Sequence, residues 1–136
     1  MPVIEGTTRL KSAAGEYDFA VDGGAVSTIT LRSATGDVLG NDIPAGAVIE
    51  GGYIEVDTVL TSGGAPTVAV ASEAAGDLQA AAAISGAPWS TTGRKSITPA
   101  FTGATTVKTT VRRSLAMTIA TATLTAGKFR VVVWYR

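Results

Sequence analysis

Hydrophobic and polar residues alternate with a period of two along much of the chain, which is the pattern of half-buried β-strands. The alternation first runs through residues 17–22 and again through residues 27–32. Gly23 and Gly24 lie between the two segments, and paired glycines supply the backbone conformations that a tight turn needs. The pattern therefore predicts a β-hairpin near the N-terminus.

A longer alternating segment, residues 47–60, is interrupted by Gly51 and Gly52. Paired glycines inside a strand indicate a bulge or a sharp bend, so we count a short strand before them and a longer one after them. The remaining strands are expected at residues 66–71, 106–113, 114–124 and 128–136. Eight short strands separated by turn residues are typical of a β-sandwich or jelly roll.

One segment favours a helix. Residues 77–84 read DLQAAAAI, in which the alanines have high helix propensity and Asp77 suits an N-cap. We predict an all-β fold, an antiparallel β-sandwich that is jelly-roll-like, with this one short helix. An N-terminal arm is expected over residues 1–16 and the sandwich domain over residues 17–136.

Composition excludes several functions. The chain has 136 residues without cysteine or histidine, which removes thiolate chemistry, Ser-His-Asp catalysis and the common zinc sites. Eleven basic residues balance eleven acidic ones, which argues against nucleic acid as a partner. No apolar segment predicts a signal peptide or a membrane span, and no cofactor is expected. Charged residues make up only 16%, and the expected outer faces are rich in threonine and alanine, so we expect another subunit to cover part of them.

Two groups of carboxylates offer candidate chemistry. Glu55 and Asp57 share a strand face, which allows a glycosidase acid–base pair, although a solvated strand face explains them more simply. Asp37 and Asp42 flank a Gly-Asn turn and offer oxygens for calcium, but they lack EF-hand spacing and fit ordinary turn chemistry. We predict neither catalytic nor metal-binding residues.

Contact residues are expected among the aromatic, basic and aliphatic side chains that lie outside the predicted core. Trp89 lies in a polar loop, where it either anchors an interface or covers one end of the sandwich. Trp134 shares a strand face with two arginines, and cation–π stacking is one role for it. The predicted capsid or subunit contacts are Val3, Ile4, Arg9, Leu10, Trp89, Arg112 and Trp134.

The order of the turn and strand phrases resembles a known family. The phrases are GDVLGND, IPAGAVIEGGYIEVDTVL, TVAVAS, GDLQAAAAISG and LTAGKFRVVVWYR, and they cover the chain from Gly36 to the C-terminus. Together they resemble the small capsid decoration proteins, also called cement or head-fibre proteins, of tailed bacteriophages. The resemblance implies a structural virion protein, often a homotrimer, that is made in the host cytoplasm. It implies that the major capsid protein of the same phage is the partner, bound on the outer surface of the head.

Two other functions stay open at this point. A receptor-binding or glycan-binding tip module of a phage tail fibre would use exposed aromatic and acidic groups, here Trp89, Tyr53, Glu55 and Asp57. A carbohydrate-active enzyme built on Glu55 and Asp57 is the less favoured alternative. The number of copies per virion separates decoration protein from fibre tip.

Overall fold

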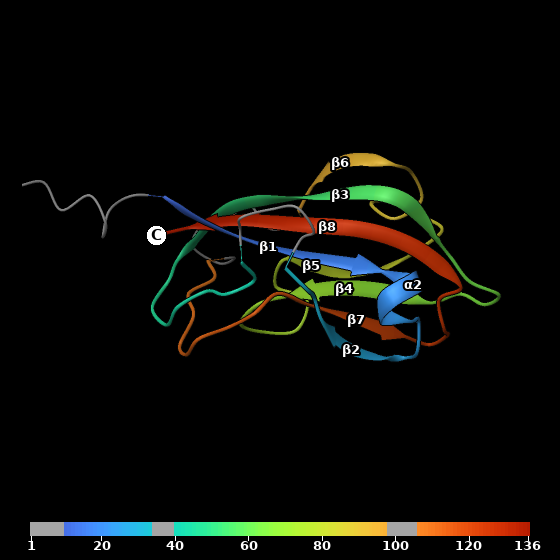
Figure 1. Ribbon diagram of the computed structural model, residues 1–136, viewed down its shortest axis with the longest axis horizontal. Helices are drawn as coiled ribbons and strands as arrows, with labels where there is room; N and C mark the ends of the chain where they lie inside the picture. The colour runs from blue at the N-terminus through green and yellow to red at the C-terminus, as the bar shows by residue number, and fades with distance from the viewer. Residues whose placement is uncertain (1–9, 34–39, 98–105) are drawn as a thin grey trace, which may run out of the picture.

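The computed structural model describes residues 10–33, 40–97 and 106–136, which form two four-stranded antiparallel sheets packed face to face (Figure 1). The first sheet contains, in spatial order, β1 (Lys11–Asp18), β8 (Ala126–Tyr135), β3 (Ile49–Thr61) and β6 (Gly93–Ser96). The second sheet contains β2 (Ser27–Thr30), β7 (Ala116–Ala120), β4 (Thr67–Ala71) and β5 (Gln79–Ala83). Among the described residues there is one helix, α2 (Phe19–Asp22), which joins β1 of the first sheet to β2 of the second. The predicted all-β sandwich with one short helix is confirmed, although the helix lies elsewhere in the chain.

The strand order shows how the chain is wound. Strand β4 pairs with β5, β3 with β6, β2 with β7 and β1 with β8. The first four strands thus pair with the last four in reverse order, as the two arms of one long hairpin would. When this hairpin winds into two layers, β8 pairs with β3 and β7 pairs with β4, which completes the two four-stranded sheets. This is the topology of a jelly roll.

The alternation of residues sets the core between the sheets. In β8 the side chains of Phe129, Val131 and Val133 point inward, and they are fully buried. Val68 and Val70 of β4 are buried from the opposite sheet. Because side chains alternate between the two faces of a strand, every second residue contributes to this core.

The predicted break at the paired glycines is confirmed as a bulge. The register of β3 against β8 shifts between Ile49 and Gly51, where Gly51 faces Trp134. A Cβ atom on Gly51 would lie 2.6 Å from the indole nitrogen of Trp134, so a larger side chain would displace the indole ring. Glycine is therefore required here by the close approach of Trp134 as well as by the bend.

The predicted N-terminal hairpin is wrong. Strand β1 begins at Lys11, within the expected arm, and it pairs with β8 in the first sheet, whereas β2 pairs with β7 in the second. Between them, residues 19–22 form α2 because Asp18 accepts a hydrogen bond from the backbone of Ala20 and Asp22 accepts one from the backbone of Asp18. These local bonds override the strand pattern. Strand β1 therefore runs across residue 16, where the arm was expected to end.

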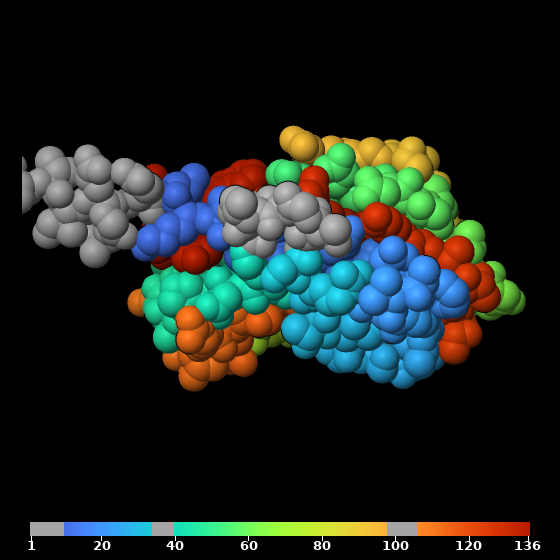
Figure 2. Space-filling view, viewed as in Figure 1, coloured from blue at the N-terminus to red at the C-terminus, as the bar shows by residue number. Residues whose placement is uncertain are grey.

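The corner between β1 and β2 is closed by polar contacts. The hydroxyl of Tyr17 donates to the carbonyl of Gly23 at 2.6 Å, and burial, with Asp22 and Asp18 nearby, raises the pKa of Tyr17 to about 12. Arg32 pairs with Asp22 at 3.0 Å. Figure 2 shows this corner on the face turned toward the viewer.

The helix expected over residues 77–84 is also wrong. Residues 79–83 form β5, which pairs with β4, and Asp77 caps a turn by accepting bonds from the backbone nitrogens of Ser72, Glu73 and Ala74. Two helical turns are marginal in isolation, so pairing to a sheet edge outweighs alanine's helix propensity.

The strand expected over residues 106–113 is reduced to isolated bridges, with Lys108 against Val48 and Arg113 against Ile43. The following strand is also shorter than expected, because β7 covers only residues 116–120. Strand β6 was not predicted, because four residues with two adjacent charges show no alternation.

Candidate interaction surfaces

The outer face of the first sheet carries a cluster of aromatic, acidic and basic side chains from three strands. Tyr53 and Glu55 come from β3, Arg94 from β6, and Arg130 and Trp134 from β8. We call these five residues the arginine–aromatic cluster. Aromatic residues and arginine are the residue types that most often anchor protein interfaces.

Contacts within the arginine–aromatic cluster hold its side chains in place. The guanidinium carbon of Arg94 lies 4.0 Å from the centre of the Tyr53 ring, and the Tyr53 and Trp134 ring centres are 6.3 Å apart. The Glu55 carboxylate lies 3.8 Å from Arg94 and 3.5 Å from Arg130. Arg94 remains 63% exposed, so its stacked guanidinium can meet a partner without first being ordered.

The two carboxylates considered for an enzyme, Glu55 and Asp57, have different surroundings. Glu55 takes part in ion pairs with two arginines. Asp57 is exposed and lies where the register of β3 shifts between Val56 and Thr58. Glu55 therefore belongs to an ion-pair network on a protein surface.

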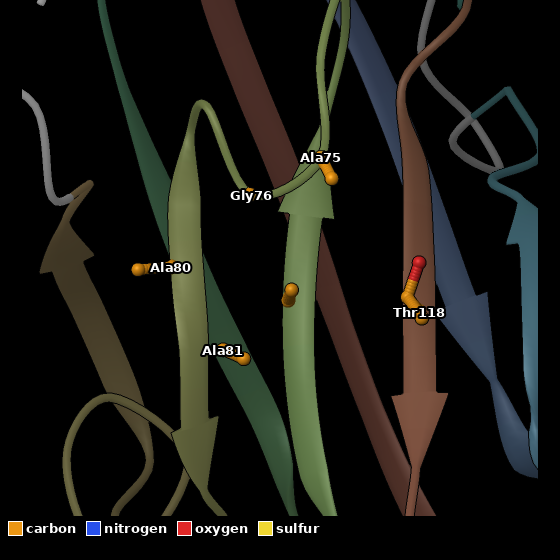
Figure 3. A pocket seen from close by; sticks show the side chains of 6 residues that line it. Ala75, Gly76, Ala80, Ala81 and Thr118 are labelled. Atoms are coloured by element: carbon orange, nitrogen blue, oxygen red, sulfur yellow. The ribbon is translucent and has the colours of Figure 1, made fainter.

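The outer face of the second sheet has the opposite character. No residue of β2, β4, β5 or β7, all of which the structure describes in full, is charged. The hydroxyls of Thr28 and Thr118 are hydrogen-bonded across β2 and β7 at 3.2 Å. A hollow of about 290 Å³ opens beside them, lined by Ala69, Ala75, Gly76, Ala80, Ala81 and Thr118 (Figure 3).

Ion pairs fasten the loops at one end of the sandwich. Glu73 accepts bonds from Arg113 at 2.8 and 3.1 Å and from the backbone and hydroxyl of Thr110 at 3.0 and 2.8 Å. The bonds from Arg113 and Thr110 lower the pKa of Glu73 to about 2. Arg112 pairs with Asp42 at 2.7 Å, which raises the pKa of Arg112.

The predicted contact residues have different environments. Leu10 is 45% exposed just before β1, and Arg112 is exposed beside Asp42. Trp134 is partly buried in the arginine–aromatic cluster. Val3, Ile4 and Arg9 lie outside the described residues.

Trp89 is fully buried and does not form a surface contact in this fold. Its indole nitrogen donates to the carbonyl of Val68 at 3.1 Å, and its ring centre lies 4.8 Å from that of Phe129. The polar loop around Trp89 folds back over the core, which is one of the two roles that the sequence left open.

Sequence reasoning missed two residues of these surfaces. Arg94 lies outside every strand expected from the sequence, and the short strand β6 that positions it has no hydrophobic periodicity. The sequence did not indicate the ion pair of Glu73, because its partners, Thr110 and Arg113, lie far along the chain. Their contacts depend on the winding of the jelly roll.

The described residues offer neither a metal site nor a membrane-spanning helix. No group of three or more acidic side chains is placed to hold a metal ion. Asp42 of the calcium alternative pairs with Arg112, and Asp37 lies outside the described residues. No helix in the described part of the chain is long and apolar enough to cross a membrane.

Comparison with solved structures finds the same fold in bacteriophage capsids. A chain of the cyanophage Pam1 capsid asymmetric unit matches with a TM-score of 0.60 and 20% identity, covering 93% of this chain and 84% of that one. A chain of the acidic stable capsid structure of Helicobacter pylori bacteriophage KHP30 matches with a TM-score of 0.59 and 13% identity, covering 93% and 86%.

A chain of the capsid of Ralstonia phage GP4 matches with a TM-score of 0.58 and 20% identity, covering 99% of this chain and 88% of that one. The chain shares its fold with chains of three phage capsids. No protein-family model and no curated protein sequence matches it. At 13–20% identity the likeness shows a shared fold, and it covers 84–88% of each matched capsid chain.

Proposed function

We propose that this chain is a structural virion protein, a decoration protein that binds the outside of a bacteriophage head and stabilises it. The observation that carries the proposal is the jelly roll that the chain shares, over 84–88% of their length, with chains of three phage capsids. The Glu55 ion pairs and the balanced charge agree with a role in assembly, and we infer that the chain is not an enzyme.

The proposed mechanism is burial of surface between subunits. The chain binds the major capsid protein of the same phage and itself, as a homotrimer, without nucleic acid or membrane. Its two outer faces differ in charge, so they suit different neighbours. A protein that binds the assembled shell and not the separated subunits stabilises the shell by mass action. The arginine–aromatic cluster supplies the anchors for the capsid contact.

Add-back to purified heads tests this function. Heads that lack the chain are incubated with the purified protein, and bound copies are counted by gel densitometry and located by cryo-electron microscopy. We expect saturable binding of hundreds of copies on the outer surface and a higher temperature of genome release. A handful of copies at the tail, or heads whose release temperature does not change at saturation, would refute the proposal.

A second candidate function rests on the arginine–aromatic cluster. Tyr53 and Trp134 side by side, with Glu55 next to them, are the groups that a glycan-binding tip of a tail fibre would use. Arg94 covers the Tyr53 ring, which makes the decoration role the better supported one, because sugar rings stack on free aromatic faces. A glycan array separates the two: binding that is lost in Tyr53→Ala would favour the tip.

A further inference from the structure

The guanidinium group of Arg94 keeps its hydrogen-bonding edge open. Arg32 and Arg113 each donate to a carboxylate within 3.0 Å, whereas Arg94 lies 3.8 Å from Glu55, which is beyond hydrogen-bond length. Within the described residues the Arg94 side chain makes no hydrogen bond, and its guanidinium stacks on the Tyr53 ring. Stacking occupies only the face of the group, because its N–H donors point outward in its plane. Those donors are therefore available to a partner.

The position of Arg94 exposes this edge while ordering the side chain. Arg94 lies in β6, the edge strand beside β3 (Figure 1), and it stands opposite Glu55 in the strand register. Its side chain is 63% exposed, against 31% for Glu55 and 33% for Arg130. Because the Tyr53 ring and the strand pairing already restrict Arg94, a partner that binds it loses little conformational entropy. An ordered and exposed arginine is well suited to anchor an interface.

The charges around Arg94 indicate what it binds. The guanidinium groups of Arg94 and Arg130 share the one carboxylate of Glu55, so positive charge is in excess within the arginine–aromatic cluster. The ammonium group of Lys95 is directed to two carbonyls of the preceding loop, at 3.1 and 2.7 Å. A carboxylate matches both the excess charge and the planar N–H edge, which can bind its two oxygens together. Nucleic acid fits less well, because its binding requires several phosphate contacts.

The neighbours of Glu55 narrow the partner further. Asp57 lies further along β3 and is exposed, so a run of several carboxylates would meet like charge there. In the other direction Tyr53 and Trp134, whose ring centres are 6.3 Å apart, offer aromatic surface. The site therefore suits one carboxylate that has apolar neighbours.

We propose that Arg94 binds a single aspartate or glutamate side chain of the capsid shell. The guanidinium edge forms a two-pronged ion pair with that carboxylate, and Tyr53 and Trp134 pack beside it. Glu55 is a positioning residue, because it attracts Arg94 without occupying its N–H edge. The inference rests on the proposed function for its partner, and it adds the residue that makes the contact and the chemical group that this residue recognises.

The test compares binding to two preparations of purified heads. One preparation is untreated, and in the other a carbodiimide and glycinamide have converted the surface carboxylates to neutral amides. Dissociation constants are measured by sedimenting the heads with increasing amounts of Arg94→Gln, Arg94→Lys or wild-type protein. Lys108→Gln is the matched control, because it removes the same charge from an exposed side chain elsewhere.

On untreated heads we expect Arg94→Gln to raise the dissociation constant at least about tenfold and Arg94→Lys about threefold, because lysine keeps the charge but has no planar edge. The control keeps the wild-type value. Amidation should weaken the wild type and the control at least about tenfold and change the binding of Arg94→Gln little, because the variant has already lost the same ion pair. Thermal melts confirm that each variant is folded.

Two outcomes would overturn the inference and leave the proposed function in place. One is Arg94→Gln that binds untreated heads like the wild type. The other is amidation that weakens Arg94→Gln as much as the wild type, since the lost carboxylate would then not be the partner of Arg94. Wild-type protein that does not bind untreated heads would overturn the inference and the proposed function together. Retention on an array of acidic glycans that Arg94→Gln abolishes, without any binding to heads, would assign Arg94 to a glycan instead and would also overturn both.

Discussion

Glu73 and Arg113, forty residues apart, form a two-pronged ion pair that joins two loops at one end of the sandwich. Thr110 adds two more bonds to the same carboxylate, so Glu73 accepts four bonds from Thr110 and Arg113 together. Isolated strand bridges and backbone hydrogen bonds join residues 106–113 to residues 43–49, and Glu73 joins the same segment to a second loop.

We predict that Glu73→Gln lowers the free energy of unfolding at neutral pH. The variant should also lose less of this free energy than the wild type as the pH falls below about 5. The pKa of Glu73 is lowered to about 2, from 4.5 when unfolded, so its contribution is complete above about pH 5 and is lost as the pH falls toward 2. Urea unfolding at pH 7, 4 and 2.5 measures this. The difference between wild type and variant is expected to shrink steadily as the pH falls.

Asp57→Asn provides the control for this measurement, because Asp57 is an exposed carboxylate in the β3 bulge. Its free energy of unfolding at pH 7 should match that of the wild type. If the difference between the wild type and Glu73→Gln stayed constant between pH 7 and 2.5, the ionised carboxylate would not be the stabilising group.

The two tryptophans are predicted to differ in their effect on stability. Trp89→Phe removes a buried hydrogen bond to Val68 and leaves a cavity, so we expect a loss of about 1–3 kcal/mol in the free energy of unfolding. Trp134→Phe, on a partly exposed sheet face, is expected to cost no more than about 1 kcal/mol. Denaturant unfolding measures both. Equal losses would contradict the assignment of Trp89 to the core.

A third prediction concerns Gly127, whose φ of +145° lies in the region that favours glycine. A Cβ atom there would meet the side chain of Leu60, and it would lie 3.2 Å from the Leu60 Cα. We expect Gly127→Ala to lower the free energy of unfolding by about 1–3 kcal/mol. Gly63→Ala is the control, because a Cβ atom on Gly63 would meet nothing within 4 Å. Similar unfolding midpoints for the two variants would count against this account.

The fold class was predictable because alternation records which side of a strand is buried. The alternation alone identified Val131 and Val133 as core residues, and the paired glycines at Gly51 indicated the bulge. Pairing partners were not predictable in the same way. The Gly23-Gly24 turn looked like a hairpin, but the adjacent strands enter different sheets, because the jelly roll pairs the beginning of the chain with its end.

Local propensity misled where tertiary contacts outweighed it. The alanines of β5 favour a helix, yet β4 presents an edge to which they bond, and Asp77 closes the turn between the two strands. The buried position of Trp89 was left open because burial of a loop depends on what covers it. The arginine–aromatic cluster also needed the structure, because Arg94 and Arg130 converge on Glu55 from separate strands.

The last prediction concerns the N-terminal segment, which mixes Val3, Ile4 and Arg9 and stays the predicted capsid contact. Deleting residues 1–9 leaves β1 intact, because pairing with β8 begins at Lys11 opposite Tyr135. We therefore expect an unchanged thermal midpoint but lower occupancy on purified heads, because the segment carries aliphatic and basic side chains suited to a protein contact. Occupancy is measured by competition between equal amounts of full-length and truncated protein. Equal occupancy would show that residues 1–9 do not contribute to capsid binding, whereas a lower thermal midpoint would show that they support the fold instead.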